Sequence, residues 1–205
     1  MRDPTGELGS AGEIVVASRS DVGRVRSANE DTCDIFERPD GTYLLVVADG
    51  MGGHQGGATA SRMAVEAIAG VFRSEISNDP SDMLRDAIQT ANQRIFELAQ
   101  RDPGLEGMGT TVVSFLLDSH GQGVVAHVGD SRAYRYRQGQ LEPLTVDHSV
   151  VAEMHQRGLI SAAEAAVHPR RNEILRSVGI GAEIEVEVDA VEVAPGDRFL
   201  LCSDG

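Results

Sequence analysis

Lysine is absent from this 205-residue chain, so all 18 of its permanently basic residues are arginines. An arginine near a carboxylate is therefore weak evidence for a binding site, since the chain has no other permanent cation. Acidic residues number 32, which gives a formal net charge of −14. Contacts to phosphate backbones or anionic lipids require a positively charged surface. The composition thus predicts that the chain binds neither nucleic acid nor a membrane surface.

Long apolar runs are also lacking. No run reaches the roughly 18 residues that a membrane-spanning helix needs, and the first residues contain no apolar core of a secretory signal. We expect residues 1–12 to form a flexible tail and residues 13–205 to form one domain, because neither a linker nor an internal repeat divides them. We further expect a cytoplasmic monomer.

Cysteine is scarce. Cys33 and Cys202 lie in separate strand-like segments, and their positions do not match the spacing of a zinc site. Buried free thiols in a reducing cytoplasm are the expectation for such a pair.

Three apolar runs, by contrast, each end on an aspartate beside a glycine. They cover residues 43–50, 124–130 and 198–205. Each is typical of a buried strand that enters a tight turn, so each would present its carboxylate, Asp49, Asp130 or Asp204, at the end of a strand. Glu30 and Asp31 add further acidic positions. Clustered carboxylates repel one another unless a cation lies among them, and an all-oxygen set suits Mg²⁺ or Mn²⁺ rather than zinc. The pattern predicts an enzyme that uses a divalent metal.

The hydrophobic periodicity predicts an α+β domain. Strands are expected at 14–18, 32–37, 43–48, 110–117, 124–128, 132–137, 183–189 and 198–204, with helices over 60–72 and 84–98. Ser81 is expected to cap the second helix, and a slip in the apolar phase predicts a bulge or a break near Ala190. Residues 146–170 form a polar helical insert, which we expect to be a mobile surface element.

Six ordered stretches then identify a family. They are Gly23–Asp31, Val47–His54, Gly107–Thr111, Val128–Arg132, Asp147–Ser149 and Leu201–Gly205. In order and spacing the chain resembles the metal-dependent Ser/Thr protein phosphatases of the PPM (PP2C-like) class, in their bacterial form. The resemblance implies a four-layer α-β-β-α sandwich with two central antiparallel sheets. It also implies hydrolysis of phosphoserine and phosphothreonine by water activated at two metal ions, on proteins phosphorylated by bacterial Ser/Thr kinases.

The resemblance also assigns metal-binding roles. Asp49 would bridge two Mn²⁺ or Mg²⁺ ions, the Gly50 carbonyl would ligate one of them, and Asp204 would ligate the other. Glu30 and Asp31 would bind directly or hold metal-bound waters.

Other positions have weaker counterparts in the family. Asp130 matches the position that can bind a third ion, and Arg26 would clamp the substrate phosphate, which suits its planar guanidinium. His54 lies three residues beyond the place where some members carry a catalytic histidine, so we do not assign it that role. His148 and His168 border the insert, which matches the family's flap, and are expected to be surface histidines.

Two other readings stay open. The family has a further metal-ligating aspartate after the Ser-Asp-Gly strand, whereas this sequence stops at Gly205, so the last part of the sheet is expected to be missing. The chain could therefore be a phosphoprotein-binding pseudophosphatase or an inactive fragment. It could also be a related phosphatase that regulates sigma-factor antagonists. The Arg26-x-x-Asn29-Glu30-Asp31 motif favours the general Ser/Thr type.

Overall fold

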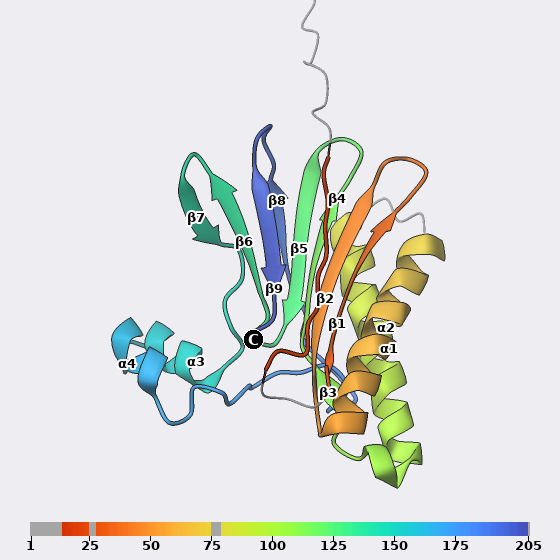
Figure 1. Ribbon diagram of the computed structural model, residues 1–205, viewed down its shortest axis with the longest axis vertical. Helices are drawn as coiled ribbons and strands as arrows, with labels where there is room; N and C mark the ends of the chain where they lie inside the picture. Colours follow the sequence, from red (N-terminus) through yellow and green to blue (C-terminus); the bar gives the residue numbers. More distant parts are fainter. Residues whose placement is uncertain (1–13, 25–27, 75–78, 205) are drawn as a thin grey trace, which may run out of the picture.

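A computed structural model describes residues 14–24, 28–74 and 79–204. Their strands form two antiparallel sheets (Figure 1). The larger sheet comprises β1 (Asp31–Glu37), β2 (Tyr43–Met51), β3 (Gly109–Thr110), β4 (Val112–Leu117), β5 (Gln122–Val128) and β8 (Glu187–Glu192). Its strand order is β1-β2-β4-β5-β8, and β3 pairs with β2. The smaller sheet, in the order β7-β6-β9, comprises β6 (Arg132–Arg137), β7 (Gln140–Pro143) and β9 (Arg198–Cys202).

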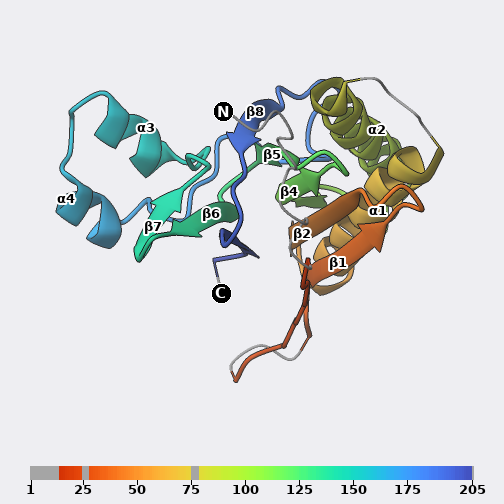
Figure 2. The ribbon, with the colours of Figure 1, turned by 90° about the horizontal axis from the view of Figure 1, so that it is seen from above.

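Two long helices, α1 (His54–Ser74) and α2 (Pro80–Arg101), cover one face of the larger sheet, as Figure 2 shows from above. Most residues of their apolar stripes are buried against it, and Met63, Val71 and Leu98 are partly buried, which is the arrangement that the helical spacing predicts. A short 3₁₀ turn, η1 (Pro103–Leu105), follows α2. The cap of α2 is Asp79, whose side chain accepts a hydrogen bond from the Ser81 amide at 2.8 Å. The prediction of Ser81 as the cap was wrong, because Pro80 is itself the first helical residue, a position that suits its missing N–H.

The opposite face of the larger sheet packs against the smaller sheet. Strand β4 is buried on both faces, since Val112 and Leu116 contribute to the core under the helices, whereas Val113 and Phe115 contribute to the core between the sheets. The Phe115 ring stacks on Phe199 of β9 with centroids 4.4 Å apart. The predicted α+β fold with two antiparallel sheets is confirmed. Within the described residues, helices cover only the larger sheet, so the fourth layer is not part of this structure.

The insert contains two short helices, α3 (Val150–Gln156) and α4 (Ala162–Val167), at one end of the smaller sheet (Figure 1). Ser149 caps α3 and Ser161 caps α4. The predicted helical character is therefore confirmed. Neither these helices nor any other in the described part of the chain has the length and apolarity to cross a membrane.

The first predicted strand, over residues 14–18, is wrong. This segment pairs with neither sheet, and Val15 is 84% exposed. The residues from Ala17 to Arg24 instead line the cleft described below, together with Cys33. A short apolar run without a partner strand gains too little burial to join a sheet.

The alternating segment 183–189 is only partly a strand. Pairing with β5 begins at Glu187, although Val186 and Ile184 already pack toward the core under the helices. The bulge predicted near Ala190 is absent, because Ala190 pairs in regular register with Val124. The apolar phase changes for another reason: Val191 packs into the core between the sheets, so the strand is buried on alternate faces along its length.

Candidate metal centre

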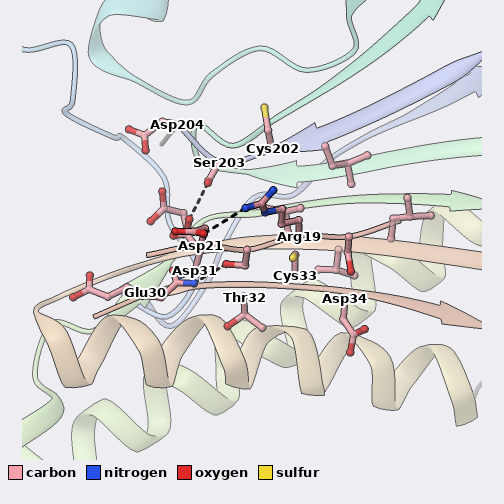
Figure 3. Close-up of a pocket in the computed structure, with 18 of the residues that line it drawn as sticks. Arg19, Asp21, Glu30, Asp31, Thr32, Cys33, Asp34, Cys202, Ser203 and Asp204 are labelled. Atoms are coloured by element: carbon pink, nitrogen blue, oxygen red, sulfur yellow. Dashed lines mark hydrogen bonds and ion pairs between the residues drawn. The ribbon is translucent and has the colours of Figure 1, made fainter. Parts of the chain in front are cut away.

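A cleft of about 820 Å³ lies between the β1–β2 pair and the end of β9 (Figure 3). Apolar side chains line one part of it, among them those of Leu45 and Leu201. The predicted ligands Asp31, Asp49 and Asp204 line another part. The structure thus brings carboxylates from β1, β2 and the segment after β9 to a single cavity.

Asp49 lies opposite Asp31 in the register of β1 and β2. Thr110 and Thr111 hold the backbone of Asp49 through hydrogen bonds. The Asp49 amide donates to Thr111 Oγ1 at 3.1 Å, and its carbonyl accepts from the Thr111 amide and from Thr110 Oγ1, both at 2.8 Å. Thr111 interrupts the predicted strand 110–117 and separates β3 from β4. The interruption allows both threonines to hold Asp49 in place.

The carboxyl group of Asp49 lies close enough to those of Asp31 and Asp204 to interact with both electrostatically. Burial and then the negative charges of these two neighbours raise the pKa of Asp49 to about 8. Within the described residues, none of the three carboxylates forms an ion pair with an arginine. A shift of this kind indicates an anionic cluster that lacks a countercharge.

Ser203 supports this cluster from the end of β9. Its hydroxyl donates to Asp31 Oδ2 at 2.9 Å, and Figure 3 shows the bond joining the two segments. Sequence reasoning assigned Ser203 no role, although it lies inside the Leu201–Gly205 stretch. Only the arrangement of the two sheets shows that its hydroxyl reaches β1.

Asp130 is half-buried and follows β5 directly after Gly129. Its pKa is raised by burial first and then by the charges of Asp204 and Asp147, while Arg132 acts in the opposite direction. Arg132 is paired with Asp147 through two hydrogen bonds of 2.8 and 2.6 Å. Asp130 is therefore close enough to the cluster to interact electrostatically with Asp204.

Glu30 is buried against the first turn of α1, with 8% of its surface exposed. A Cβ atom on Gly57 would lie 2.9 Å from Glu30 Oε2. A Cβ atom on Gly50 would lie 2.1 Å from the Gly57 carbonyl oxygen and 2.6 Å from that of Glu30. Only glycine at both positions lets β2, α1 and Glu30 approach one another this closely.

Other predictions have different outcomes. Arg26 and Gly205 lie outside the described residues, and the His54 side chain is not described, so the role given to Arg26 stays a prediction. The ligand roles of the acidic residues and of the Gly50 carbonyl likewise stay predictions. His148 was expected at the surface, and this was wrong: it is 8% exposed and hydrogen-bonded through both ring nitrogens. Cys33 and Cys202 are free, as expected, but the expectation that both are buried was wrong, because each is partly exposed in the cleft.

The donor set fits a hard divalent cation. Every candidate ligand offers oxygen, and the cluster is partly buried and without a paired arginine among the described residues. Mg²⁺ and Mn²⁺ prefer such ligands. A cation among the carboxylates would offset the repulsion that raises the pKa of Asp49.

Known proteins are similar to this chain in sequence and in fold. The family model "Protein phosphatase 2C" matches residues 23–205. The serine/threonine phosphatase stp of Listeria welshimeri is 40% identical over 191 residues, which cover 91% of this chain and 75% of that protein. Among solved structures, the serine/threonine phosphatase of S. agalactiae superposes with a TM-score of 0.83 at 36% identity, covering 90% of this chain and 76% of the other.

A further solved structure bears on the carboxylate cluster. It is the catalytic domain of the serine/threonine protein phosphatase PstP in complex with two manganese ions, which is similar with a TM-score of 0.78 at 37% identity over 92% of this chain and 76% of that one. The family match spans all the candidate ligands, and the fold agrees with the solved relatives. This chain belongs to the protein phosphatase 2C family.

Proposed function

We propose that this chain hydrolyses phosphoserine and phosphothreonine in proteins, with Mn²⁺ or Mg²⁺ held by Asp31, Asp49 and Asp204. The observation that carries the proposal is the convergence of these three carboxylates on one cleft, with Asp31 directly opposite Asp49 in the pairing of β1 and β2. The raised pKa of Asp49, caused by burial and by the two neighbouring carboxylates, supports it. Related proteins are serine/threonine phosphatases, and one of them has been solved with two manganese ions. The natural substrates would be proteins phosphorylated by bacterial Ser/Thr kinases.

The residues of the chain have distinct tasks in this proposal. Two bound ions supply the activation of a water nucleophile and the neutralisation of charge on the phosphoryl group. Asp49 lies between Asp31 and Asp204 and is suited to contact both ions, together with the Gly50 carbonyl. Ser203 orients the Asp31 carboxylate through its hydrogen bond.

More peripheral residues complete the proposed site. Glu30, buried beside the start of α1, would hold metal-bound waters or bind directly, and Asp130 would provide a third, weaker cation position. Arg26 would clamp the substrate phosphate. Residues 146–170, which include α3 and α4, would act as a flap of the single domain 13–205. We propose a cytoplasmic monomer.

The test is the release of phosphate from a phosphothreonine peptide in the presence of Mn²⁺, with EDTA as the blank. Asp49→Asn should abolish the release, because it removes the charge shared between Asp31 and Asp204. Asp34→Asn, an exposed position on the same strand as Asp31, serves as the matched control and should keep full activity. A folded chain that binds the peptide without releasing phosphate would overturn the proposal and support a pseudophosphatase.

A further inference from the structure

Two histidines and a glutamate form a second polar cluster, built from β5, the root of the insert and β8. The His127 and His148 rings stack with centroids 4.5 Å apart and an interplanar angle of 21°. His148 Nε2 lies 2.9 Å from Glu187 Oε2, and His127 Nε2 lies 2.9 Å from the Val146 carbonyl oxygen. His127 Nδ1 is buried without a hydrogen-bond partner, the only such side-chain atom in the described part of the chain.

The composition of this cluster is that of a transition-metal site, since the three residues offer ligand atoms within 4.8 Å of one another. His127 would fit a metal, because its Nε2–H can donate to Val146 and leave Nδ1 as a free acceptor. The surroundings of His148 do not fit. Its Nδ1 accepts a hydrogen bond from the Gly129 amide at 3.2 Å, and an amide N–H can only donate.

The amide of Gly129 therefore determines the tautomer of His148. Nδ1 is unprotonated, so the neutral ring carries its proton on Nε2 and donates it to Glu187. A metal-ligating histidine normally donates its second ring N–H to an acceptor, whereas the second nitrogen of His148 faces a donor. A metal at Nε2 would require loss of both hydrogen bonds. Burial lowers the pKa of His148, which is consistent with a neutral ring.

His148 holds Gly129 at both of its backbone polar groups. In addition to the bond to Nδ1, the His148 amide donates to the Gly129 carbonyl at 2.9 Å. Gly129 has φ of +106°, and a Cβ atom there would lie 2.7 Å from the Thr111 side chain. Asp130 directly follows Gly129. Thr111, against which Gly129 packs, also accepts a hydrogen bond from the Asp49 amide. His148 thus binds the residue that directly precedes Asp130 and holds the turn that leads to it.

We propose that His148 is a positioning residue, which holds the Gly129–Asp130 turn through its Nδ1 atom so that the Asp130 carboxylate faces the metal centre. Glu187 and the stacked His127 ring hold the imidazole in the required tautomer and orientation. The inference rests on the proposed function, since it concerns the metal affinity of that site.

Two substitutions separate the two hydrogen bonds of the ring. His148→Asn retains an acceptor, Oδ1, at the position of Nδ1 and loses the donor to Glu187. His148→Gln retains a donor at the position of Nε2 and loses the acceptor for Gly129. Binding of Mn²⁺ is measured by the loss of the free-ion EPR signal, and melting temperatures verify that each variant is folded. His120→Gln, in the exposed β4–β5 turn, is the matched control.

We expect His148→Gln to weaken the Asp130-dependent Mn²⁺ binding by about tenfold or more, as loss of an outer contact to a metal ligand typically does. His148→Asn should retain most of that affinity. The effect of His148→Gln should disappear in an Asp130→Asn background, because residues that act through one another are not additive. Equal losses in the two His148 variants, or an undiminished loss in the Asp130→Asn background, would overturn the proposal.

A measurement on the unsubstituted chain guards against variants that fail to fold. The ¹⁵N chemical shifts of the His148 ring should show a protonated Nε2 and an unprotonated Nδ1, with and without Zn²⁺. The opposite tautomer, or displacement of the Nε2 proton by Zn²⁺, would overturn the proposal and favour a metal site.

Absence of phosphate release from a chain that still shows the expected Mn²⁺ binding would refute the proposed function alone. An active chain in which His148→Gln binds Mn²⁺ normally would refute only the role of His148.

Discussion

Asp31 and Asp49 are direct partners in the antiparallel pairing of β1 and β2, and the negative charge of Asp31 raises the pKa of Asp49. Two like charges at neighbouring positions in a sheet are destabilising unless a proton or a cation lies between them. Asp204 approaches from the other sheet and adds a third carboxylate. Either a proton or a bound cation would relieve this repulsion, so we expect both metal affinity and stability to depend on pH.

The first prediction concerns that proton. An aspartate in the unfolded chain loses its proton near pH 4, whereas Asp49 in the folded, metal-free chain keeps it until about pH 8. Between these values the folded state binds more protons than the unfolded state, so the free energy of unfolding falls as the pH rises. The stabilisation is fully present below about pH 4 and is lost as the pH rises through about 8. Melting curves in EDTA should show the decline.

Comparison with two variants isolates the contribution of Asp49. Asp49→Asn cannot ionise, so its melting temperature should decline less with pH than that of the unsubstituted chain. Asp34→Asn, at an exposed position of β1, should leave the decline unchanged. An identical decline in Asp49→Asn would show that other groups account for it.

The second prediction concerns Ser203. Ser203→Ala removes the hydroxyl that donates to Asp31 Oδ2 and leaves every candidate ligand in place. We expect the Mn²⁺ concentration for half-maximal phosphatase activity to rise about tenfold, as is usual when an outer hydrogen bond to a ligand is lost. Activity at saturating Mn²⁺ should change much less. Ser119→Ala, in the exposed β4–β5 turn, is the control, and equal Mn²⁺ requirements in the two variants would argue against this role.

The third prediction contrasts two glycines. Gly50→Ala would place a methyl group 2.1 Å from the Gly57 carbonyl oxygen, which is backbone and can move only if α1 moves. Overpacking of this kind lowers the free energy of unfolding by about 1–3 kcal/mol or more. Gly70→Ala, within α1, meets no atom within 4 Å and should instead stabilise the helix by about 0.5–1 kcal/mol. Urea unfolding of both variants tests the difference, and a stabilised Gly50→Ala would contradict the close approach of β2 and α1.

The sequence predicts the two long helices and the hairpin turn well, because the periodicity of apolar residues and the turn residues are clear there. The apolar stripes of α1 and α2 match the observed buried faces, and the Gln138-Gly139 turn has positive φ at both residues, as a tight hairpin requires. The pattern over residues 183–193 was harder to interpret. Val188 and Val191 pack into different cores, so a strand buried on both faces resembles a strand with a bulge.

The candidate site could be predicted only where a motif gave a residue its role. Asp31, Asp49 and Asp204 come together as expected: Asp31 begins β1, Asp49 lies opposite it near the end of the antiparallel strand β2, and Asp204 follows β9. Ser203 and His148 were missed for a physical reason. Their partners, Asp31 and Gly129, are distant in sequence, and hydrogen bonds between distant segments leave no local pattern. Exposure cannot be inferred from a position beside a polar insert, as the buried His148 illustrates.

The last prediction concerns Asn92, a buried residue of α2 that holds the chain between the insert and β8. Its Oδ1 accepts from the Gly179 amide at 2.7 Å, and its Nδ2 donates to the Gly181 carbonyl at 2.9 Å. Asn92→Leu would leave the buried Gly179 amide without a partner, so we expect the free energy of unfolding to fall by about 2–4 kcal/mol. Gln93→Leu, at an exposed position one residue away, should change it by less than about 0.5 kcal/mol. Urea unfolding measures both. Equal costs would mean that α2 does not anchor this segment, whereas the expected difference would show that the hydrogen bonds from Asn92 to Gly179 and Gly181 stabilise the fold.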